Sequence, residues 1–313
     1  MRIIKKIIIL FKVLFNFGIK LFFLNIFKFL FKNNKYLFNY FNNKKHNQIL
    51  YILQRKYNYL IIKYNKLFND SYQDKPLISD IIWICWWDGI ENMPPIVKAC
   101  YNSVNKYSQG FKVNLITKNN LSDYITLPEH IDKKVKNKNI SITHLSDIIR
   151  ALLIKKYGGL WLDATVLVTD NINMDYPYLF TIRREYGGDN VSKRRWAGNC
   201  IAGSVNNPLF EFLSEFFSEY WKNNNFLIDY FLIDYAIMLA FNNIPLINKM
   251  INDIGNNNIE YLTFNENLHK EFSMDLYRKT ICNTKFHKLY WRFKNNKFSD
   301  NKLTLYNYIL QHF

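Results

Sequence analysis

Residues 146–168 read SDIIRALLIKKYGGLWLDATVLV, and this stretch decides the fold. Around its first half, apolar residues recur at the i, i+3, i+4, i+7 spacing of one helix face. They are Leu145, Ile148, Ile149, Leu152 and Leu153. Two glycines, Gly158 and Gly159, stand where the helix should end, and the apolar period then changes to two. The spacing predicts a helix followed by one strand over residues 160–168.

Three charged side chains interrupt this apolar pattern. Asp147 and Arg150 are three residues apart, so they project from the same side of the predicted helix. Asp163 lies inside the predicted strand, where a bare carboxylate is costly unless it has a partner. One explanation is a buried ion pair that only ties the helix to the strand. The other is a binding site in which the carboxylates meet a cation, a metal ion or sugar hydroxyls.

The motif Ser146-Asp147-x-x-Arg150, followed by Tyr157-Gly158-Gly159-Leu160-Trp161-Leu162-Asp163, resembles the core of sugar transferases that carry a DXD motif. The resemblance is to the bacterial capsular polysaccharide synthesis proteins, related to glycosyltransferase family 32. Initiating mannosyltransferases of the yeast type and the clostridial glucosylating toxins are similar at a greater distance. The resemblance implies a single α/β domain of GT-A type, Rossmann-like with a mixed sheet. It also implies that Asp147, Arg150, Trp161 and Asp163 bind the donor, and that Asp147, Arg150 and Asp163 are catalytic.

Thr165 stands where the family motif has its second acid. In the family, this acid helps to hold a divalent cation, Mn²⁺ or Mg²⁺, on the donor diphosphate. Asp163 and Thr165 still offer two oxygen-bearing side chains, but a hydroxyl is a weaker ligand for a hard cation than a carboxylate. Metal-dependent and metal-independent transfer therefore both stay open. Metal-independent transfer would need another cation beside the leaving diphosphate.

Further candidates for the diphosphate or the acceptor follow the core motif. A basic loop over residues 181–195 carries arginines that suit a diphosphate or an acidic glycan. The segment over 196–203 resembles the strand that closes the sugar pocket in relatives. A helix predicted over 226–242 carries Asp229 and Asp234, and the resemblance implies that one of them faces the cleft. Residues 284–289 resemble a C-terminal segment of the capsule proteins. The candidates in these segments are Arg183, Arg184, Arg194, Asn199, Asp234, His287 and Lys288.

A β-α-β unit is predicted before the core motif. Its parts are a buried strand over 81–86, a helix from Pro94 and a second strand over 111–117, which implies parallel strands. Trp86 and Trp87 come at the end of the first strand, where open α/β sheets bind ligands. An aromatic ring there can stack on a nucleobase for about 1–3 kcal/mol. We expect Trp86, with Trp87 beside it, to contact the donor base; the alternative is that both belong to the core.

Charge is concentrated in the N-terminal quarter of the 313 residues. The net charge is +17, but residues 1–75 hold 15 Lys or Arg and 2 acids, so the other residues contribute only +4. A nucleic-acid binder would carry basic residues along its working face, whereas this distribution suits attraction to anionic lipid. The four cysteines are far apart and form no C-x-x-C pair. This argues against a zinc site and a secreted disulfide framework.

The N-terminal quarter predicts a membrane-associating region, residues 1–75, ahead of a catalytic domain, residues 76–313. Residues 3–31 are mostly apolar with spaced lysines, and no run reaches the roughly 18 uninterrupted apolar residues of a spanning helix. We expect an interfacial helix lying in the membrane plane. A tilted transmembrane anchor with snorkelling lysines and a helix packed on the body are the alternatives. Residues 32–75 predict a connecting helix that either lifts the body off the membrane or packs on it as core.

The resemblance thus implies a hexosyltransferase that uses a nucleotide-sugar donor and retains the anomeric configuration. The expected acceptor is a growing surface glycan or lipid-linked glycan, of a capsular polysaccharide or a lipo-oligosaccharide. We expect the protein at the cytoplasmic face of a bacterial inner membrane, with polysaccharide-assembly partners and without nucleic acid. One alternative is a nucleotidyl or phosphosugar transferase, although the glycine-rich phosphate loop is absent from the sequence. Another is a non-catalytic, membrane-bound glycan-binding scaffold in which Thr165 marks a decayed motif.

Overall fold

The computed structural model describes residues 2–68, 77–174, 176–292 and 303–313, with side chains from residue 8 onward. The predicted domain boundary after residue 75 lies outside the described residues. The strands are β1 (Ile81–Cys85), β2 (Lys112–Ile116), β3 (Gly159–Asp163), β4 (Val166–Val168), β5 (Leu179–Thr181), β6 (Cys200–Gly203) and β7 (Phe286–Lys288). The helices are α1 (Arg2–Phe17), α2 (Ile19–Leu30), α3 (Lys35–Phe68), α4 (Pro95–Tyr107), α5 (Leu121–Tyr124), α6 (Glu129–Lys136), α7 (Ile142–Tyr157), α8 (Pro208–Asn223), α9 (Leu232–Asn243), α10 (Pro245–Asn252), α11 (Thr263–Asn267), α12 (Met274–Ile281) and α13 (Leu305–His312).

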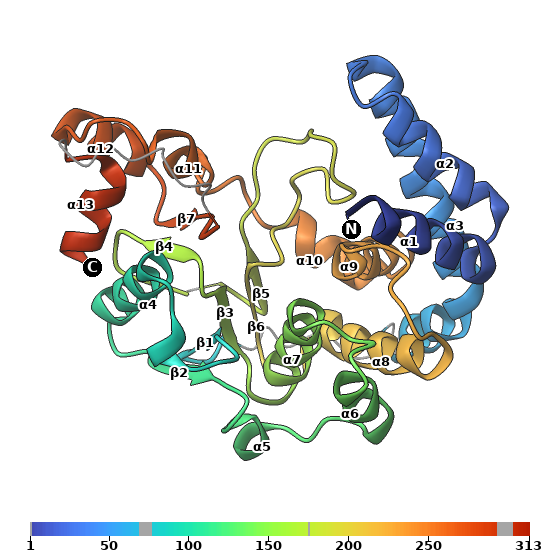
Figure 1. Ribbon diagram of the computed structural model, residues 1–313. Coiled ribbons are helices and arrows are strands. Elements are labelled where there is room, and N and C mark those ends of the chain that lie inside the picture. The colour runs from blue at the N-terminus through green and yellow to red at the C-terminus, as the bar shows by residue number, and fades with distance from the viewer. Residues whose placement is uncertain (1, 69–76, 175, 293–302) are drawn as a thin grey trace.

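A five-stranded mixed sheet, in the order β2-β1-β3-β6-β5, forms the centre of the molecule (Figure 1). β1 runs parallel to β2 and to β3, and β6 runs antiparallel to both β3 and β5. The predicted mixed α/β class and the parallel β-α-β unit are therefore confirmed. The N-terminal helices and the C-terminal helices lie on opposite sides of this sheet (Figure 1).

The turn from α7 into β3 follows the sequence closely. The Ser141 side chain caps α7 by accepting a hydrogen bond from the His144 amide. Gly158 and Gly159 end the helix at φ of 68° and 99°, a backbone region that side chains with a Cβ rarely adopt. A Cβ on Gly159 would lie 2.5 Å from the Ile81 carbonyl oxygen, so this glycine also lets β3 approach β1.

The strand predicted over residues 160–168 is not continuous. It breaks after Asp163 into a turn at Ala164 and Thr165, and β4 then leaves the five-stranded sheet to pair with β7. The prediction of one strand was wrong because the pairing partner of β4 comes more than a hundred residues later, at Phe286–Lys288. The break brings Thr165 next to the C-terminal part of the chain, since the Thr165 carbonyl accepts a hydrogen bond from the Leu289 amide at 2.8 Å.

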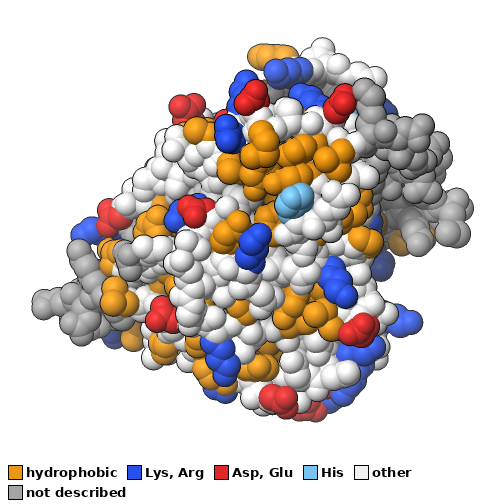
Figure 2. Space-filling view, turned by 90° about the vertical axis from the view of Figure 1, so that its left-hand side faces the viewer, with side chains coloured by type: hydrophobic (Ala, Val, Ile, Leu, Met, Phe, Trp, Pro, Cys, Tyr) orange, Lys and Arg blue, Asp and Glu red, His pale blue; other side chains and the backbone are white. Residues whose placement is uncertain are grey.

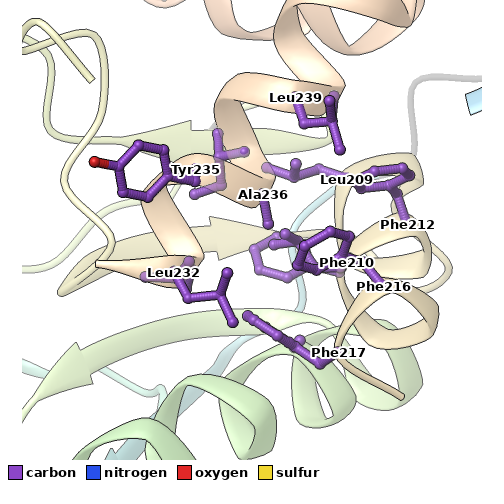
Figure 3. Packing of buried hydrophobic residues seen from close by; sticks show 14 of the residues in the cluster. Leu209, Phe210, Phe212, Phe216, Phe217, Leu232, Tyr235, Ala236 and Leu239 are labelled. Atoms are coloured by element: carbon purple, nitrogen blue, oxygen red, sulfur yellow. The ribbon is translucent and has the colours of Figure 1, made fainter. Parts of the chain in front are cut away.

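Helices α8 and α9 carry much of the core on one side of the sheet (Figure 3). Their buried side chains include Leu209, Phe210, Phe212, Phe216, Phe217, Leu232, Tyr235, Ala236 and Leu239. The helix predicted over 226–242 begins only at Leu232. Residues before it form a turn, in which the Asp229 carboxylate accepts a hydrogen bond from the Phe231 amide at 3.0 Å. Asp229 therefore lies outside α9, contrary to the prediction.

Helix α3 packs on the body and does not extend away from it. Its apolar stripe, Ile49, Leu53, Tyr57 and Leu60, is buried in the same core as α8 and α9. The Tyr57 ring meets the Phe216 ring edge-on at 5.0 Å. Of the two alternatives for this segment, packing as core is the one observed.

The apolar N-terminal segment forms two helices, α1 and α2, which meet at Gly18. Val13 and Leu21 join the core, while many apolar side chains stay exposed. The exposed ones are Ile8, Ile9, Phe11, Phe15, Ile19, Phe23, Phe27, Phe29 and Leu30. Within the described residues, no helix has the length and apolar character needed to cross a membrane.

The side of the molecule that carries the C-terminal helices also exposes apolar side chains. Figure 2 shows hydrophobic side chains gathered around one histidine, with Lys, Arg, Asp and Glu scattered over the rest of that face. Among the C-terminal helices, the Tyr308 ring stacks on Phe272 at 3.9 Å and on His312 at 3.8 Å. The stack on Phe272 helps to hold α13 against the domain, while the stack on His312 lies within α13 itself.

Candidate functional site

The candidate site lies beyond the carboxyl ends of the parallel strands β1 and β3. Cys85, the last residue of β1, pairs with Asp163, the last residue of β3. Helix α7 precedes β3 and supplies Asp147 and Arg150 to the same place. The site therefore occupies the edge at which open α/β sheets bind their ligands.

Arg150 joins the two carboxylates that the sequence singled out. One guanidinium nitrogen donates to Asp147 Oδ1 at 3.2 Å, and the other terminal nitrogen donates to Asp163 Oδ1 at 3.0 Å. The guanidinium also lies 4.8 Å from the centre of the Trp161 ring. Arg150 is only 3% exposed, and these partners replace part of the water that it loses on burial, since its buried Nε has no hydrogen-bond partner among the described residues.

The network continues from Asp147 into helix α8. Trp221 Nε1 donates to His144 Nε2 at 3.0 Å, so that ring nitrogen is unprotonated. The ring proton is then on Nδ1, which donates to Asp147 Oδ2 at 3.2 Å. His144 and Trp221 are both buried, and together they fix the Asp147 carboxylate. Sequence reasoning missed this role: the His144–Asp147 spacing was visible, but nothing local pointed to Trp221.

At the other end of the network, Lys288 reaches Asp163 from strand β7. Its Nζ donates to Asp163 Oδ2 at 2.9 Å and to Thr165 Oγ1 at 2.6 Å. Asp163 Oδ1 also accepts from Trp161 Nε1 at 2.9 Å. Both carboxylate oxygens of Asp163 are thus hydrogen-bonded, one of them to the ammonium group.

These partners decide the ionisation of Asp163. Burial alone would raise the pKa of its carboxyl group, but the charges of Lys288 and Arg150 and the hydrogen bond from Trp161 outweigh burial. The pKa of Asp163 is therefore held below its usual value, and the group is an anion at neutral pH. The site as a whole pairs two carboxylates with two cations.

Asn199 borders the same carboxylate. Its backbone carbonyl accepts a hydrogen bond from the Asp163 amide at 2.9 Å, and its side chain accepts one from the Tyr261 hydroxyl. The Arg184 guanidinium lies 5.9 Å from the centre of the Tyr261 ring. Asn199 therefore lines the site, and Arg184 forms an outer layer behind Tyr261.

Gly198 lets the chain pass close to Arg150. A Cβ at this position would lie 3.3 Å from an Arg150 terminal nitrogen and 3.9 Å from Ile233 Cδ1. The start of α9 thus lies next to the Arg150 network. Sequence reasoning gave Gly198 no role, since only the fold brings it to α7.

Three predicted residues take other places. Arg183 donates to the carbonyls of Ile251 and Asn252 at 2.9 and 3.1 Å, so it provides hydrogen bonds to the free carbonyl groups at the C-terminal end of α10. Arg194 is exposed on its loop. His287 is fully buried, with its ring edge-on to Phe264 at 4.6 Å, and burial lowers its pKa to about 3. Strand alternation explains why His287 enters the core while its neighbour Lys288 faces the site.

Trp86 and Trp87 follow the end of β1 and are both half-buried. Trp86 Nε1 donates to the Asn92 carbonyl at 3.2 Å, and its ring meets Trp291 edge-on at 5.6 Å. Trp87 packs against the main core. Trp86 is thus beside the strand end that carries Asp163, as the register of β1 and β3 requires.

Asp234 lies between the network and a cavity. Trp196 Nε1 donates to its carboxylate at 2.8 Å. Burial, chiefly, and the nearby Asp147 charge raise the pKa of Asp234 to about 6. The same side chain lines a cavity of 330 Å³ enclosed by α2, α3, residues 189–191 and the start of α9.

The family of capsular polysaccharide synthesis proteins matches the chain over residues 30–309. The chain is also similar to the O-glycosyltransferase braB of Annulohypoxylon truncatum, with 30% identity over 99 residues. That match covers 28% of this chain and about a quarter (24%) of the length of the curated relative. Among solved structures, the chain is similar to the PaToxG glycosyltransferase at 18% identity, with a TM-score of 0.39, over 69% of this chain and 83% of that one.

Proposed function

The chain belongs to the capsular polysaccharide synthesis protein family, and from this premise we propose that it is a nucleotide-sugar-dependent glycosyltransferase. One observation carries the proposal: Arg150 bridges Asp147 and Asp163 beyond the carboxyl ends of β1 and β3. A purely structural ion pair would need one carboxylate, whereas here two are held apart by a single guanidinium. Such an arrangement presents fixed acceptors and donors to the hydroxyls of one sugar ring.

The donor sugar lies against the Arg150 network. Asp147 and Asp163 accept hydrogen bonds from its hydroxyls, and Arg150 holds both carboxylates in place. Trp86 stacks on the donor base, with Trp87 supporting it from the core side. Transfer proceeds through positioning and stabilisation of the leaving group. The family resemblance further suggests retention of the anomeric configuration.

The acceptor is a growing surface glycan, of a capsular polysaccharide or a lipo-oligosaccharide, and it enters through the cavity beside Asp234. Charged and amide side chains line that cavity, including Asn42 and the Lys45–Asp229 pair, whose Nζ–Oδ2 distance is 2.5 Å. Tyr230 and Phe231 add aromatic faces. Polar groups interleaved with rings suit a saccharide. Among the described residues, the buried Asn42 Oδ1 has no hydrogen-bond partner, so an acceptor hydroxyl can satisfy it.

Helices α1 and α2 bring the enzyme to the membrane that carries its acceptor. Their exposed phenylalanine and isoleucine side chains and their lysines suit the interface of an anionic membrane. We place the protein, on this proposal, at the cytoplasmic face of a bacterial inner membrane. Nucleotide sugars and lipid-linked glycans meet there, together with other proteins of polysaccharide assembly.

The test is a donor-hydrolysis screen of the purified full chain. UDP-, GDP- and CMP-sugars are incubated with the protein, and release of the nucleotide product is measured, with nucleotide binding followed by calorimetry. We expect one donor to be cleaved slowly with water as acceptor. A protein that neither binds nucleotides nor cleaves any donor would contradict the proposal and favour a glycan-binding scaffold.

Asp163→Asn is the matched variant for this screen. The amide keeps the shape but loses the charge that Arg150 and Lys288 neutralise, so we expect donor cleavage to be abolished while circular dichroism shows an intact fold. Asp170→Asn is the control, because Asp170 is exposed and lies 3.9 Å from its partner Lys285; it should cleave the donor like the wild type. Near-normal turnover of Asp163→Asn would refute the assignment of the site.

A further inference from the structure

Lys288 holds the position that the family resemblance gives to a metal ion. The predicted metal ligands were Asp163 and Thr165, and the Lys288 ammonium donates to both of them, at 2.9 and 2.6 Å. The other oxygen of Asp163 is taken by Arg150 and Trp161. A divalent ion could bind Asp163 and Thr165 only by displacing this ammonium group.

The remaining donor set does not fit Mn²⁺ or Mg²⁺. These hard cations prefer about six oxygen ligands, with carboxylates supplying the charge. Here one carboxylate and one hydroxyl are available, and Arg150 and Lys288 place two positive charges beside them. Over the described ranges, no group of three or more His, Cys, Asp or Glu side chains is arranged to hold a metal ion.

The backbone fixes Lys288 firmly. β7 pairs with β4 so that Lys288 stands opposite Val166, the residue after Thr165. The Lys288 amide donates to the Tyr261 carbonyl at 2.8 Å, and the Lys288 carbonyl accepts from the Asn265 side chain. The Lys288 side chain is 18% exposed, so the charge is held in place but can still contact a ligand.

Other basic residues predicted for the diphosphate are less well placed. Arg183 binds the end of α10, Arg194 is exposed, and Arg184 lies behind the Tyr261 ring. Within the described residues, none of the three donates a hydrogen bond to Asp163 or Thr165, whereas Lys288 donates to both.

We propose that the Lys288 ammonium group replaces the divalent cation, binds the diphosphate of the nucleotide-sugar donor and makes transfer independent of metal. This inference rests on the proposed function. In the transfer, the bond between the anomeric carbon and the leaving phosphate oxygen breaks, and its electron pair stays on that oxygen. A bond forms from the acceptor oxygen to the anomeric carbon, and the acceptor proton passes to a phosphate oxygen. Lys288 keeps its protons and opposes the negative charge that grows on the diphosphate.

The first experiment uses the wild-type protein and the donor that it cleaves. Release of the nucleoside diphosphate is measured in excess EDTA, and then with Mn²⁺ or Mg²⁺ added back. We expect the same rate in all three conditions. Loss of activity in EDTA that Mn²⁺ restores would overturn the proposal for Lys288 and leave the proposed function standing. A wild type without nucleotide binding or donor cleavage would instead remove the proposed function, and this inference with it.

Variants at Lys288 test the role of its charge. Lys288→Met keeps the length of the chain but not its charge, and we expect donor cleavage to fall at least about 100-fold, the usual effect of removing one charge-stabilising group. Binding of the nucleoside diphosphate should weaken, while binding of the nucleoside alone should not. Lys288→Arg, which keeps a cation, should restore part of the activity in EDTA. Lys288→Met with wild-type turnover would overturn the proposal.

Two further variants complete the design. Lys285→Met is the matched control, because Lys285 lies in the same segment and is directed to the Asn171 carbonyl at 3.0 Å; its cleavage rate should equal that of the wild type. The double variant Thr165→Asp with Lys288→Ala restores the two acids of the family motif and removes the ammonium group. We expect this variant to cleave the donor only with Mn²⁺ present. Circular dichroism and thermal melting of each variant separate loss of function from loss of fold.

Discussion

Arg150 shows how a single side chain can organise a site. A guanidinium that is 3% exposed needs partners for its charge and its donors, and it finds them in Asp147, Asp163 and the Trp161 ring. Lysine would carry the same charge but could not reach two carboxylates in one plane. Arg150 therefore sets the distance between the two acids, at which they would meet the sugar on the proposed function.

Asp234 gives a prediction about stability and pH. Its pKa is about 6 in the folded protein and about 3.9 in an unfolded chain, so the folded state holds the proton more tightly. Stability is then lost as the pH rises from about 4 to 6, and an ionised Asp234 destabilises the fold at neutral pH. Asp234→Asn keeps an acceptor for Trp196 without the charge. We expect it to raise the free energy of unfolding at pH 7 and above by about 1–2 kcal/mol.

Thermal melting of the wild type and Asp234→Asn over a pH series checks this. The difference in Tm should be largest above pH 7 and should vanish near pH 4. A difference that is the same at every pH would mean that the charge of Asp234 is not its cause. Because Asp234 lines the cavity proposed for the acceptor, we also expect the stabilised variant to transfer more slowly to a glycan acceptor than the wild type.

At this scale, the sequence was informative where residues are close in the chain. Asp147, Arg150, Trp161 and Asp163 lie within 17 residues of each other, and the structure brings them together as predicted. The contact of Lys288 with Thr165 spans 123 positions. Nothing in the local pattern could distinguish Lys288 from its neighbour His287, because the choice depends on which face of β7 is turned toward the core.

Among the elements, the turn from α7 to β3 is the most constrained. We expect Gly159→Ala to unfold the domain or abolish its soluble expression. The added Cβ would meet the Ile81 carbonyl oxygen at 2.5 Å and Ile81 Cβ at 3.0 Å, at a φ of 99°. A clash with backbone cannot be relieved by a rotamer change, so β1 and β3 would have to separate.

Gly255→Ala is the control for this variant, because a Cβ at Gly255 meets nothing within 4 Å. Soluble yield and thermal melting of the two variants are compared with the wild type. If Gly159→Ala melted at the wild-type temperature, the close approach of β3 to β1 would be wrong.

The elements also show where periodicity fails. Helix α7 and strands β1 and β2 follow from apolar spacing and glycine stops, since short-range packing decides them. Apolar spacing does not predict the break between β3 and β4 or the late start of α9. Pairing of β4 with β7, a strand far away in the chain, causes the first difference. The turn closed by the Asp229 side chain delays the start of α9 and causes the second.

At the scale of the whole molecule, helices α1 and α2 bury some apolar side chains against the body and expose others to the surroundings. Deleting residues 1–31 removes α1, α2 and their exposed apolar side chains. We expect the shortened protein to move from the membrane to the soluble fraction. It should stay folded but less stable, since the buried Val13 and Leu21 each contribute about 1.5–3 kcal/mol. Fractionation and flotation with anionic vesicles, followed by thermal melting, measure both effects.

Deleting residues 1–68 is the contrasting variant. It also removes α3, whose buried stripe covers α8 and α9, and we expect an insoluble protein because that large apolar face would be exposed. If the variant without residues 1–31 stayed on the membrane in high salt, the anchor would lie elsewhere in the chain.

The pairing of β4 with β7 has a consequence for inheritance. It brings position 165 into contact with position 288, so we expect the effect of a substitution at one position to depend on the residue at the other. An ancestor with acids at both 163 and 165 would gain little from a lysine at 288 while a metal ion occupied that place. Descendants should therefore fall into two lineages, one with the second acid and no lysine and one with threonine and lysine, and intermediates should be rare.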